Sequence, residues 1–207
     1  SKDEKGVYKM LDTLKTVLRF KSLYTIGALI ASGYYEFKGF DAGPVFSVLG
    51  YNEVEGLRLR LGGRTYFGQN DLWRMEGFGA FGFKDQKFKY GLSGKVLVSK
   101  KNRKILFGGH RKDIEQTGAS LTNSKDVLGR NRASSGLITV GANDRLTSIE
   151  LTTLGYQMEP VKNFTFRVLG SHRTLKSASE TFSLCYYDQN GDINSTLKQS
   201  ELELGIN

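Results

Sequence analysis

The sequence predicts an all-β protein, an antiparallel meander of long strands. Two observations predict it: apolar and polar residues alternate with period two, and the alternating stretches are separated by glycine-rich or charged turns. The 207 residues include 25 Gly, 13 Phe and 10 Tyr but only 2 Pro, a composition that suits many strands. The stretch Phe88–Ser99 alternates throughout. It is longer than the roughly 5–6 residues of an average strand and close to the ~9–11 residues of a membrane strand.

Residues 1–20 are predicted to form an amphipathic helix and linker ahead of the sheet. Apolar side chains recur at helical spacing over Val7–Arg19, with charged residues mostly opposite. Such a helix either docks on its own protein or lies in a membrane interface, and the sequence leaves both alternatives open.

Residues 21–207 are predicted to form the sheet. After Ile105–His110 the strand pattern is expected to fade into polar sequence at Arg111–Gln116, and 117–135 is predicted to be a long polar loop. The alternation continues to the last residues, so the chain is expected to end within a strand of an incomplete barrel. The other strands are expected at Leu23–Phe37, Val54–Phe67, Leu72–Phe83, Lys87–Ser99, Gly136–Val140, Arg145–Met158, Phe164–Ser171, Glu180–Tyr187 and Glu201–Ile206. Phe40–Tyr51 is expected to hold a turn or bulge followed by a short apolar strand.

Seven charged residues are predicted to share the face of successive strands that lies opposite the apolar residues. In Leu57–Leu61 the leucines take one face and the arginines the other. A soluble sheet would expose this charged face to water, whereas a membrane barrel would turn it toward a wet interior. The pattern alone fits both. The charged set is Arg58, Arg60, Arg74, Glu76, Lys87, Lys89 and Lys95, and in the barrel Leu57, Leu59, Leu61, Tyr90, Val96 and Phe166 would contact lipid.

The chain is basic, with a net charge of +9 and a pI near 9.5. This charge suits a solvated basic surface, an anion-attracting interior or contact with acidic lipid headgroups. No helix-turn-helix, ribonucleoprotein or zinc-finger pattern accompanies it, so no nucleic-acid partner is expected. No apolar run reaches the ~20 residues that a membrane helix needs.

The sequence predicts no catalytic residues, no cofactor and no bound metal. A G-x-G-x-x-G match at Gly77–Gly82 lies inside a strand pattern and precedes another strand, whereas a dinucleotide site needs a strand-to-helix turn. Cys185 is the only cysteine, and His110 and His172 lack metal-ligand spacing. A hydrolase would need a clustered Ser-His-acid site, and no nucleophile elbow is present.

One stretch resembles a known family. The run Gly50–Thr65, with its YNEVEGLRLRLGGRT sequence, is similar to large outer-membrane proteins of Bacteroidota. These join an N-terminal carboxypeptidase-regulatory-like domain to a β-barrel domain of unknown function. Ser32–Tyr35, Gly43-Pro44, Phe81–Asp85, Lys89-Tyr90 and Gln199–Glu201 fit the same family.

The resemblance covers the chain from about Phe20 on. It implies the first part of a transmembrane β-barrel in the cell outer membrane, without catalytic residues. Its partners would be outer-membrane lipid and other envelope proteins.

Two functional hypotheses follow. The first is a non-enzymatic outer-membrane β-barrel protein with a role in envelope transport, assembly or scaffolding. The alternative is a soluble β-sandwich binding module whose basic face recognises an anionic glycan or polymer. Partition between membrane and water distinguishes them.

Overall fold

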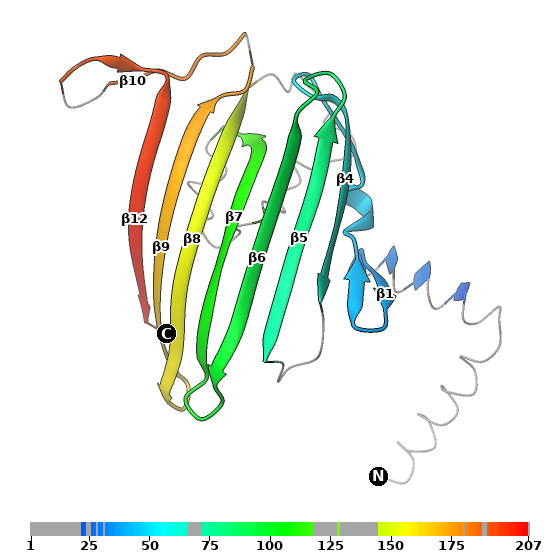
Figure 1. Cartoon of the computed structure of the whole chain (residues 1–207), viewed down its shortest axis with the longest axis vertical. Coiled ribbons are helices and arrows are strands. Elements are labelled where there is room, and N and C mark those ends of the chain that lie inside the picture. Colours follow the sequence, from blue (N-terminus) through cyan, green and yellow to red (C-terminus); the bar gives the residue numbers. More distant parts are fainter. Residues whose placement is uncertain are drawn as a thin grey trace.

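The structure is a computed structural model and describes residues 22–23, 26–27, 29–30, 32–65, 72–117, 128, 145–179, 181–187 and 190–206. These residues form a ten-stranded antiparallel sheet and a separate two-stranded hairpin, which confirms the predicted all-β meander (Figure 1). The sheet consists of β1 (Tyr35–Phe37), β2 (Phe40–Ala42), β3 (Leu49–Asn52), β4 (Gly56–Thr65), β5 (Trp73–Gly82), β6 (Phe88–Ser99), β7 (Lys104–Gln116), β8 (Leu146–Val161), β9 (Phe164–Ser177) and β12 (Thr196–Ile206). β10 (Tyr186–Tyr187) and β11 (Ile193–Asn194) form the hairpin, and η1 (Val45–Ser47) is a short 3-10 turn.

The strand order is β1-β2-β4-β5-β6-β7-β8-β9-β12, with β3 paired to the upper part of β4. Every pairing is antiparallel, and from β4 to β9 each strand pairs with its neighbour along the chain. Seven strands have ten to sixteen residues, β8 being the longest. Such lengths exceed the average globular strand.

The predicted strand Leu23–Phe37 is wrong in its first part, because Leu23, Ile26 and Ile30 lie in helical conformation. Gly33 ends this helical segment: its φ is +74°, and its N–H donates to the Leu29 carbonyl over 2.8 Å. Glycine adopts this left-handed conformation without the steric cost that a side chain imposes. A short apolar run fits helix and strand equally well, which explains the error.

Two further strand predictions need correction. The strand from Ile105 does not fade at Arg111, since β7 continues to Gln116. Within the described part of the predicted strand Glu180–Tyr187, only Tyr186–Tyr187 pair as a strand. The predicted helix in residues 1–20, the strand Gly136–Val140 and nearly all of the loop 117–135 lie outside the described residues.

Burial on the two faces of the sheet is the reverse of that in a soluble one-sided sheet. The face that carries Arg58, Arg60 and Arg111 is the buried one, and these side chains are 2%, 3% and 1% exposed. The opposite face carries Leu57 and Leu92, which are 50% and 51% exposed. We call these the polar face and the apolar face.

Close packing across the strands combines glycine with aromatic rings. The ring of Phe107 fills the space that a Cβ at Gly155 would need, at 2.3 Å, and the ring of Phe78 does the same beside Gly91, at 2.5 Å. All four residues lie on the polar face, where each ring covers the glycine of a paired strand. A larger residue at either glycine would displace the ring.

Candidate functional site

The polar face gathers six of the seven predicted charged residues. Arg58, Arg60, Arg74, Glu76, Lys89 and Lys95 lie on it because the register aligns their strands: Arg60 opposes Ala80, Ala80 opposes Lys89, and Arg74 opposes Lys95. Lys87 lies outside the strands. It is exposed in the turn that precedes β6.

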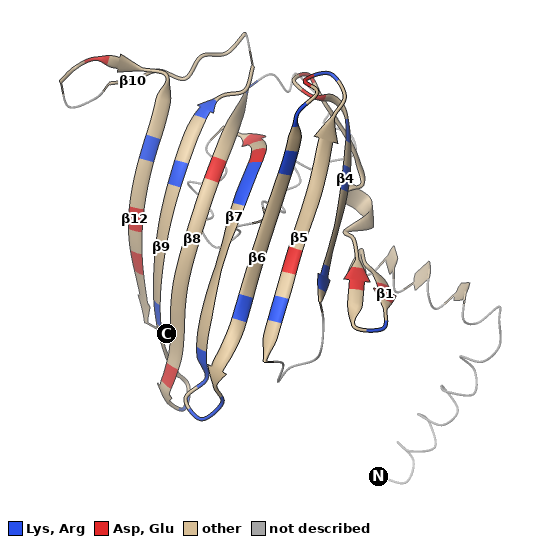
Figure 2. Ribbon diagram, in the orientation of Figure 1, with Lys and Arg blue, Asp and Glu red and all other residues tan. Residues whose placement is uncertain are grey.

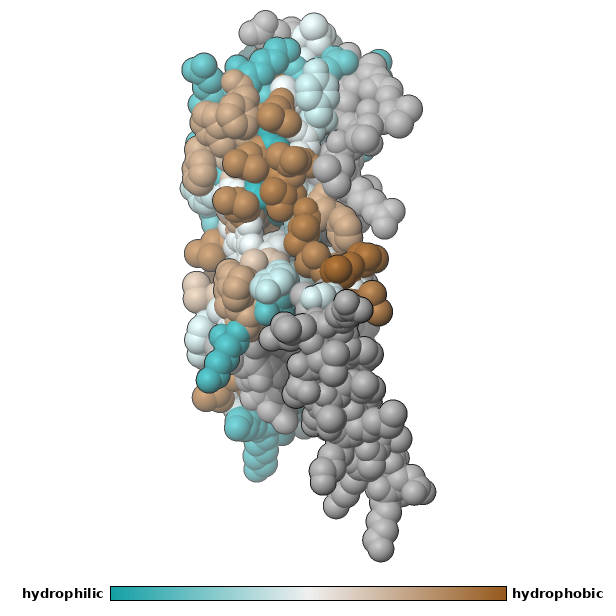
Figure 3. Space-filling view, turned by 90° about the vertical axis from the view of Figure 1, so that its right-hand side faces the viewer, coloured by the Kyte–Doolittle hydropathy of each residue, from teal (hydrophilic) through white to brown (hydrophobic). Residues whose placement is uncertain are grey.

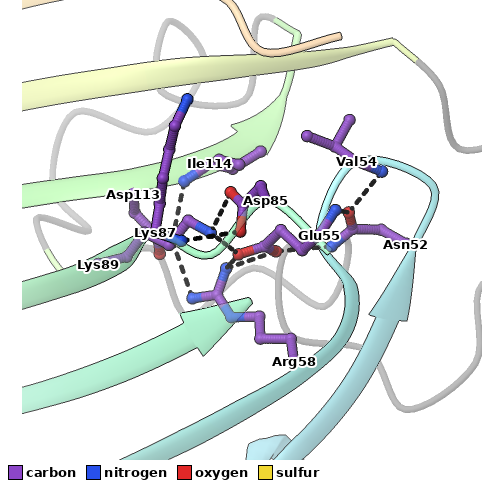
Figure 4. Close-up of polar contacts among 9 residues, drawn as sticks. All are labelled: Asn52, Val54, Glu55, Arg58, Asp85, Lys87, Lys89, Asp113 and Ile114. Carbon is purple, nitrogen blue, oxygen red and sulfur yellow. Dashed lines mark hydrogen bonds and ion pairs between the residues drawn. The ribbon is translucent and has the colours of Figure 1, made fainter. Parts of the chain in front are cut away.

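Arg58 is the centre of a buried ion network (Figure 4). Its guanidinium lies 3.1 Å from Glu55 Oε2 and 2.8 Å from Asp113 Oδ1, and both carboxylates are fully buried. Lys89 Nζ joins the network at 2.6 Å from Glu55 Oε1 and 2.5 Å from Asp85 Oδ2. The network therefore connects β4, β6, β7 and two turns.

The turn between β3 and β4 holds Glu55 in place. The side-chain carbonyl of Asn52 accepts hydrogen bonds from the Val54 and Glu55 backbone N–H groups, at 3.1 and 2.7 Å. The Asn52 amide donates to Glu55 Oε2 over 2.6 Å. Asparagine favours such turns because its short side chain can bond to the backbone just after it. The conformation of Asn52 thus aims the Glu55 carboxylate at Arg58.

The remaining buried cations of the polar face are also contacted. Arg111 binds Glu115 at 2.6 Å, Arg173 binds Glu201, and the guanidinium of Arg60 lies 3.7 Å from the centre of the Phe78 ring. Among the described residues, five cations and four carboxylates are buried. Near-balanced, paired charge is what a buried polar face requires, because an unpaired buried charge is very costly.

The pKa of the Glu55 carboxyl is lowered. Burial alone would raise this pKa, but attraction to Arg58 and Lys89 and hydrogen bonds from Lys89 and Asn52 outweigh it. Glu55 lies in a turn beyond the end of the exposed leucines of β4.

Acid is therefore expected to destabilise the fold partly through Glu55. Since its folded-state pKa is depressed, its contribution to stability is complete above the unfolded value near 4.5 and is lost as pH falls through the folded value. The unfolding midpoint of the wild type should decrease as the pH is lowered from about 6 to about 3, and it should decrease less in Glu55→Gln. Glu36→Gln, at an exposed position on β1, should behave like the wild type. Equal falls in Glu55→Gln and the wild type would contradict the assignment.

A cavity of about 470 Å³ opens on the polar face toward the β6–β7 turn. Of its charged lining residues, five are cationic and only Glu76 is acidic. Arg74 of β5 and Lys95 of β6 lie directly opposite each other. Two like charges in this position destabilise the strand pair unless an anion lies near them. The cations are Arg64, Arg74, Lys95, Arg103 and Arg167.

Sequence reasoning missed most carboxylates of the network and the arginines of later strands. Arg111, Asp113 and Glu115 alternate with period two at the end of β7, a signal that could have extended the charged face. Instead, the polarity of this stretch indicated that the strand fades. Glu55 gave no such signal, because its role depends on the Asn52 turn.

No group of His, Cys, Asp and Glu among the described residues could hold a metal ion. Nor does any helix in that part of the chain have the length and apolar character needed to cross a membrane. Comparison with known proteins gives no relative: no family profile, curated protein or solved structure matches the chain.

Proposed function

We propose that the chain forms part of the wall of a membrane-spanning β-barrel, with lipid against the apolar face and the polar face toward the barrel interior. One observation carries the proposal. Large apolar side chains are exposed along one whole face, while arginines and carboxylates are buried on the other. A soluble β-sandwich would bury the apolar face between its two sheets instead.

The apolar face has the extent that a bilayer requires. On β6 the outward residues from Phe88 to Val98 are apolar, ten residue steps or about 33 Å along the strand. Tilted by about 40°, the strand spans roughly 25 Å, the height of the apolar band of outer-membrane barrels. Figure 3 shows hydrophobic side chains gathered across the middle of the surface near β4, with hydrophilic side chains above.

The apolar band crosses the hydrogen-bonded rows of the sheet obliquely. One row on the apolar face starts with Leu61 on β4 and ends with Lys198 on β12. On β12 the exposed apolar residue Leu202, 71% exposed, lies two rows below Lys198. The apolar residues therefore lie lower on β12 than on β4. Strands of a closed barrel tilt relative to its axis, so a membrane plane must cut their rows at an angle.

The connections suggest which end of the strands faces outward. The links from β7 to β8 and from β9 to β12 are long, whereas residues 100–103 and 162–163 make short turns at the opposite end. Bacterial barrels have short periplasmic turns and longer extracellular loops. We assign the long-connection end, which also holds Glu55 and Asp85, to the outer side of the membrane.

The proposed role is that of a non-enzymatic barrel protein of the outer membrane, in envelope transport, assembly or scaffolding. The basic lining of the polar-face cavity favours passage or binding of anions there. The resemblance of Gly50–Thr65 to outer-membrane proteins supports the location.

Trp73 provides the test, because it is the only tryptophan and lies on the apolar face of β5, 44% exposed. In phospholipid vesicles its fluorescence should be strongly quenched by lipids with brominated acyl chains. The bromines nearest the headgroups should quench most, since tryptophan favours the interface.

A matched variant moves the probe to the other face. Trp73→Phe combined with Phe107→Trp places the only indole on the polar face. Brominated lipid should leave its fluorescence nearly unchanged. Equal quenching of both proteins, or of neither, would overturn the proposed arrangement.

A further inference from the structure

On β7, β8, β9 and β12 the apolar residues give way to a polar row, which on β6 continues as the exposed Leu92 because the apolar band is oblique. In this row Thr152 is paired with His110 and His172, and His172 is paired with Ser200. His110 Nδ1 lies 2.9 Å from Thr152 Oγ1, and His172 Nδ1 lies 2.8 Å from Ser200 Oγ. The two histidines thus flank Thr152 on the apolar face, and the next row down holds Gly108, Leu154, Gly170 and Leu202.

Beyond this row the outward surface is basic. Lys112, Lys176 and Lys198 are exposed there, and the only carboxylate among the described outward residues of these four strands is Glu150. Figure 2 shows basic segments on the upper parts of β7, β9 and β12 with an acidic segment on β8. Together with Lys87, His110 and His172, these lysines form what we call the basic surface.

The lysines of the basic surface differ from those of the polar face in having no counterion. Lys89 on the polar face binds two carboxylates. In the part of the chain that the structure describes, the ammonium groups of Lys112, Lys176 and Lys198 form neither an ion pair nor a hydrogen bond. On these four strands three lysines face one carboxylate, so this surface attracts anions.

A pocket concentrates this charge. Pairing between β6 and β7 stops at Tyr90 and Lys112, although β7 continues to Gln116, and the gap contains a pocket of about 220 Å³. Lys87, Lys112 and Lys176 line it from the turn, β7 and β9, and Ser148 lines it from β8. Its other charged lining residues are Lys89, Asp85 and Asp113, which are paired with one another or with Arg58 and Glu55 in the buried network. Ammonium groups and hydroxyls are the partners that a phosphate group binds.

We propose that the basic surface binds the phosphate groups of anionic lipid headgroups, in the leaflet at the long-connection end of the strands. This inference rests on the proposed membrane-spanning function. Position favours lipid over a soluble anion, because Lys112, Lys176 and Lys198 lie above the exposed Leu154 and Leu202, toward the long-connection end where the headgroup phosphates would be. The pocket takes one phosphate, and the histidine row contacts headgroups beside it through the unpaired Nε2 edges.

The test measures which lipids the protein retains at its perimeter. The full chain is reconstituted in phosphatidylcholine vesicles with traces of spin-labelled phosphatidic acid or spin-labelled phosphatidylcholine. Electron spin resonance then gives the association constant of each lipid from the fraction that is motionally restricted. Wild type should prefer phosphatidic acid at least about fivefold, the effect of roughly one lysine at a charged membrane surface.

Two triple variants with the same change of charge show which lysines cause the preference for phosphatidic acid. Lys112→Gln/Lys176→Gln/Lys198→Gln should bring the ratio to within about twofold of one. Lys100→Gln/Lys101→Gln/Lys162→Gln, in exposed turns at the other end of the strands, should keep the wild-type ratio. Unchanged restriction of phosphatidylcholine shows that each variant is folded and inserted.

The failures are distinguishable. Equal restriction of both lipids by the wild type, or an equal loss of preference in both variants, overturns the phosphate-binding surface and leaves the barrel proposal intact. If the wild-type chain restricts neither lipid, it does not span the bilayer, and the proposed function falls together with this inference.

Discussion

Replacing Arg58 with methionine is expected to lower the free energy of unfolding by about 3–5 kcal/mol. The substitution retains much of the side-chain volume but leaves the buried carboxylates of Glu55 and Asp113 without the cation that lies 3.1 and 2.8 Å away. Removing one partner of a buried pair costs more than the pair contributes, because the remaining charge stays desolvated. Urea titration in phospholipid vesicles, followed by Trp73 fluorescence, measures the change.

Two controls define this expectation. Arg103→Met removes an arginine that is 68% exposed and 3.8 Å from Glu159, and it should cost less than about 1 kcal/mol. Adding Glu55→Gln and Asp113→Asn to Arg58→Met should recover part of the lost stability, because the orphaned charges disappear. If Arg58→Met and Arg103→Met were equally mild, the buried network would contribute little.

Period-two alternation predicted the strands and their faces because both are local properties. For β6 the prediction began at Lys87 and the strand begins at Phe88, while both end at Ser99. A side chain's face depends only on whether its position in the strand is odd or even, so the pattern also placed Arg58 and Arg60 on one face. The alternation does not place Lys87, because this residue lies in the turn before β6 and not in the strand.

The ion network could not be predicted in the same way, since it depends on strand register. The pairing of Tyr90 with Lys112 brings Lys89 and Asp113 to the same end of β6 and β7, and no sequence pattern shows which residues of two strands will be opposite. The contact from Arg58 on β4 to Asp113 on β7 crosses over β5 and β6, which lie between these strands in the sheet. Nor does the alternation say which face is buried. Only the structure shows the leucines exposed and the arginines buried.

The substitution Leu92→Arg is expected to cost much more stability than the same substitution in a soluble sheet. Leu92 is 51% exposed at the middle of the outward residues of β6. An exposed leucine of a soluble sheet can become arginine with a change within about 0.5 kcal/mol. In a bilayer the same position lies near the hydrocarbon midplane, and Leu92→Arg should cost about 2–4 kcal/mol.

The depth dependence makes this prediction specific. Phe88, four residues earlier on the same face, is 63% exposed at the upper limit of the apolar band, so Phe88→Arg should cost only about 0–1 kcal/mol. Unfolding by urea in phospholipid vesicles measures both variants. A soluble sheet would show no such gradient, because water is equally accessible at both positions. Two equally small costs would therefore mean that the exposed leucines face water or another protein, whereas a steep difference requires a medium whose polarity changes along the strand.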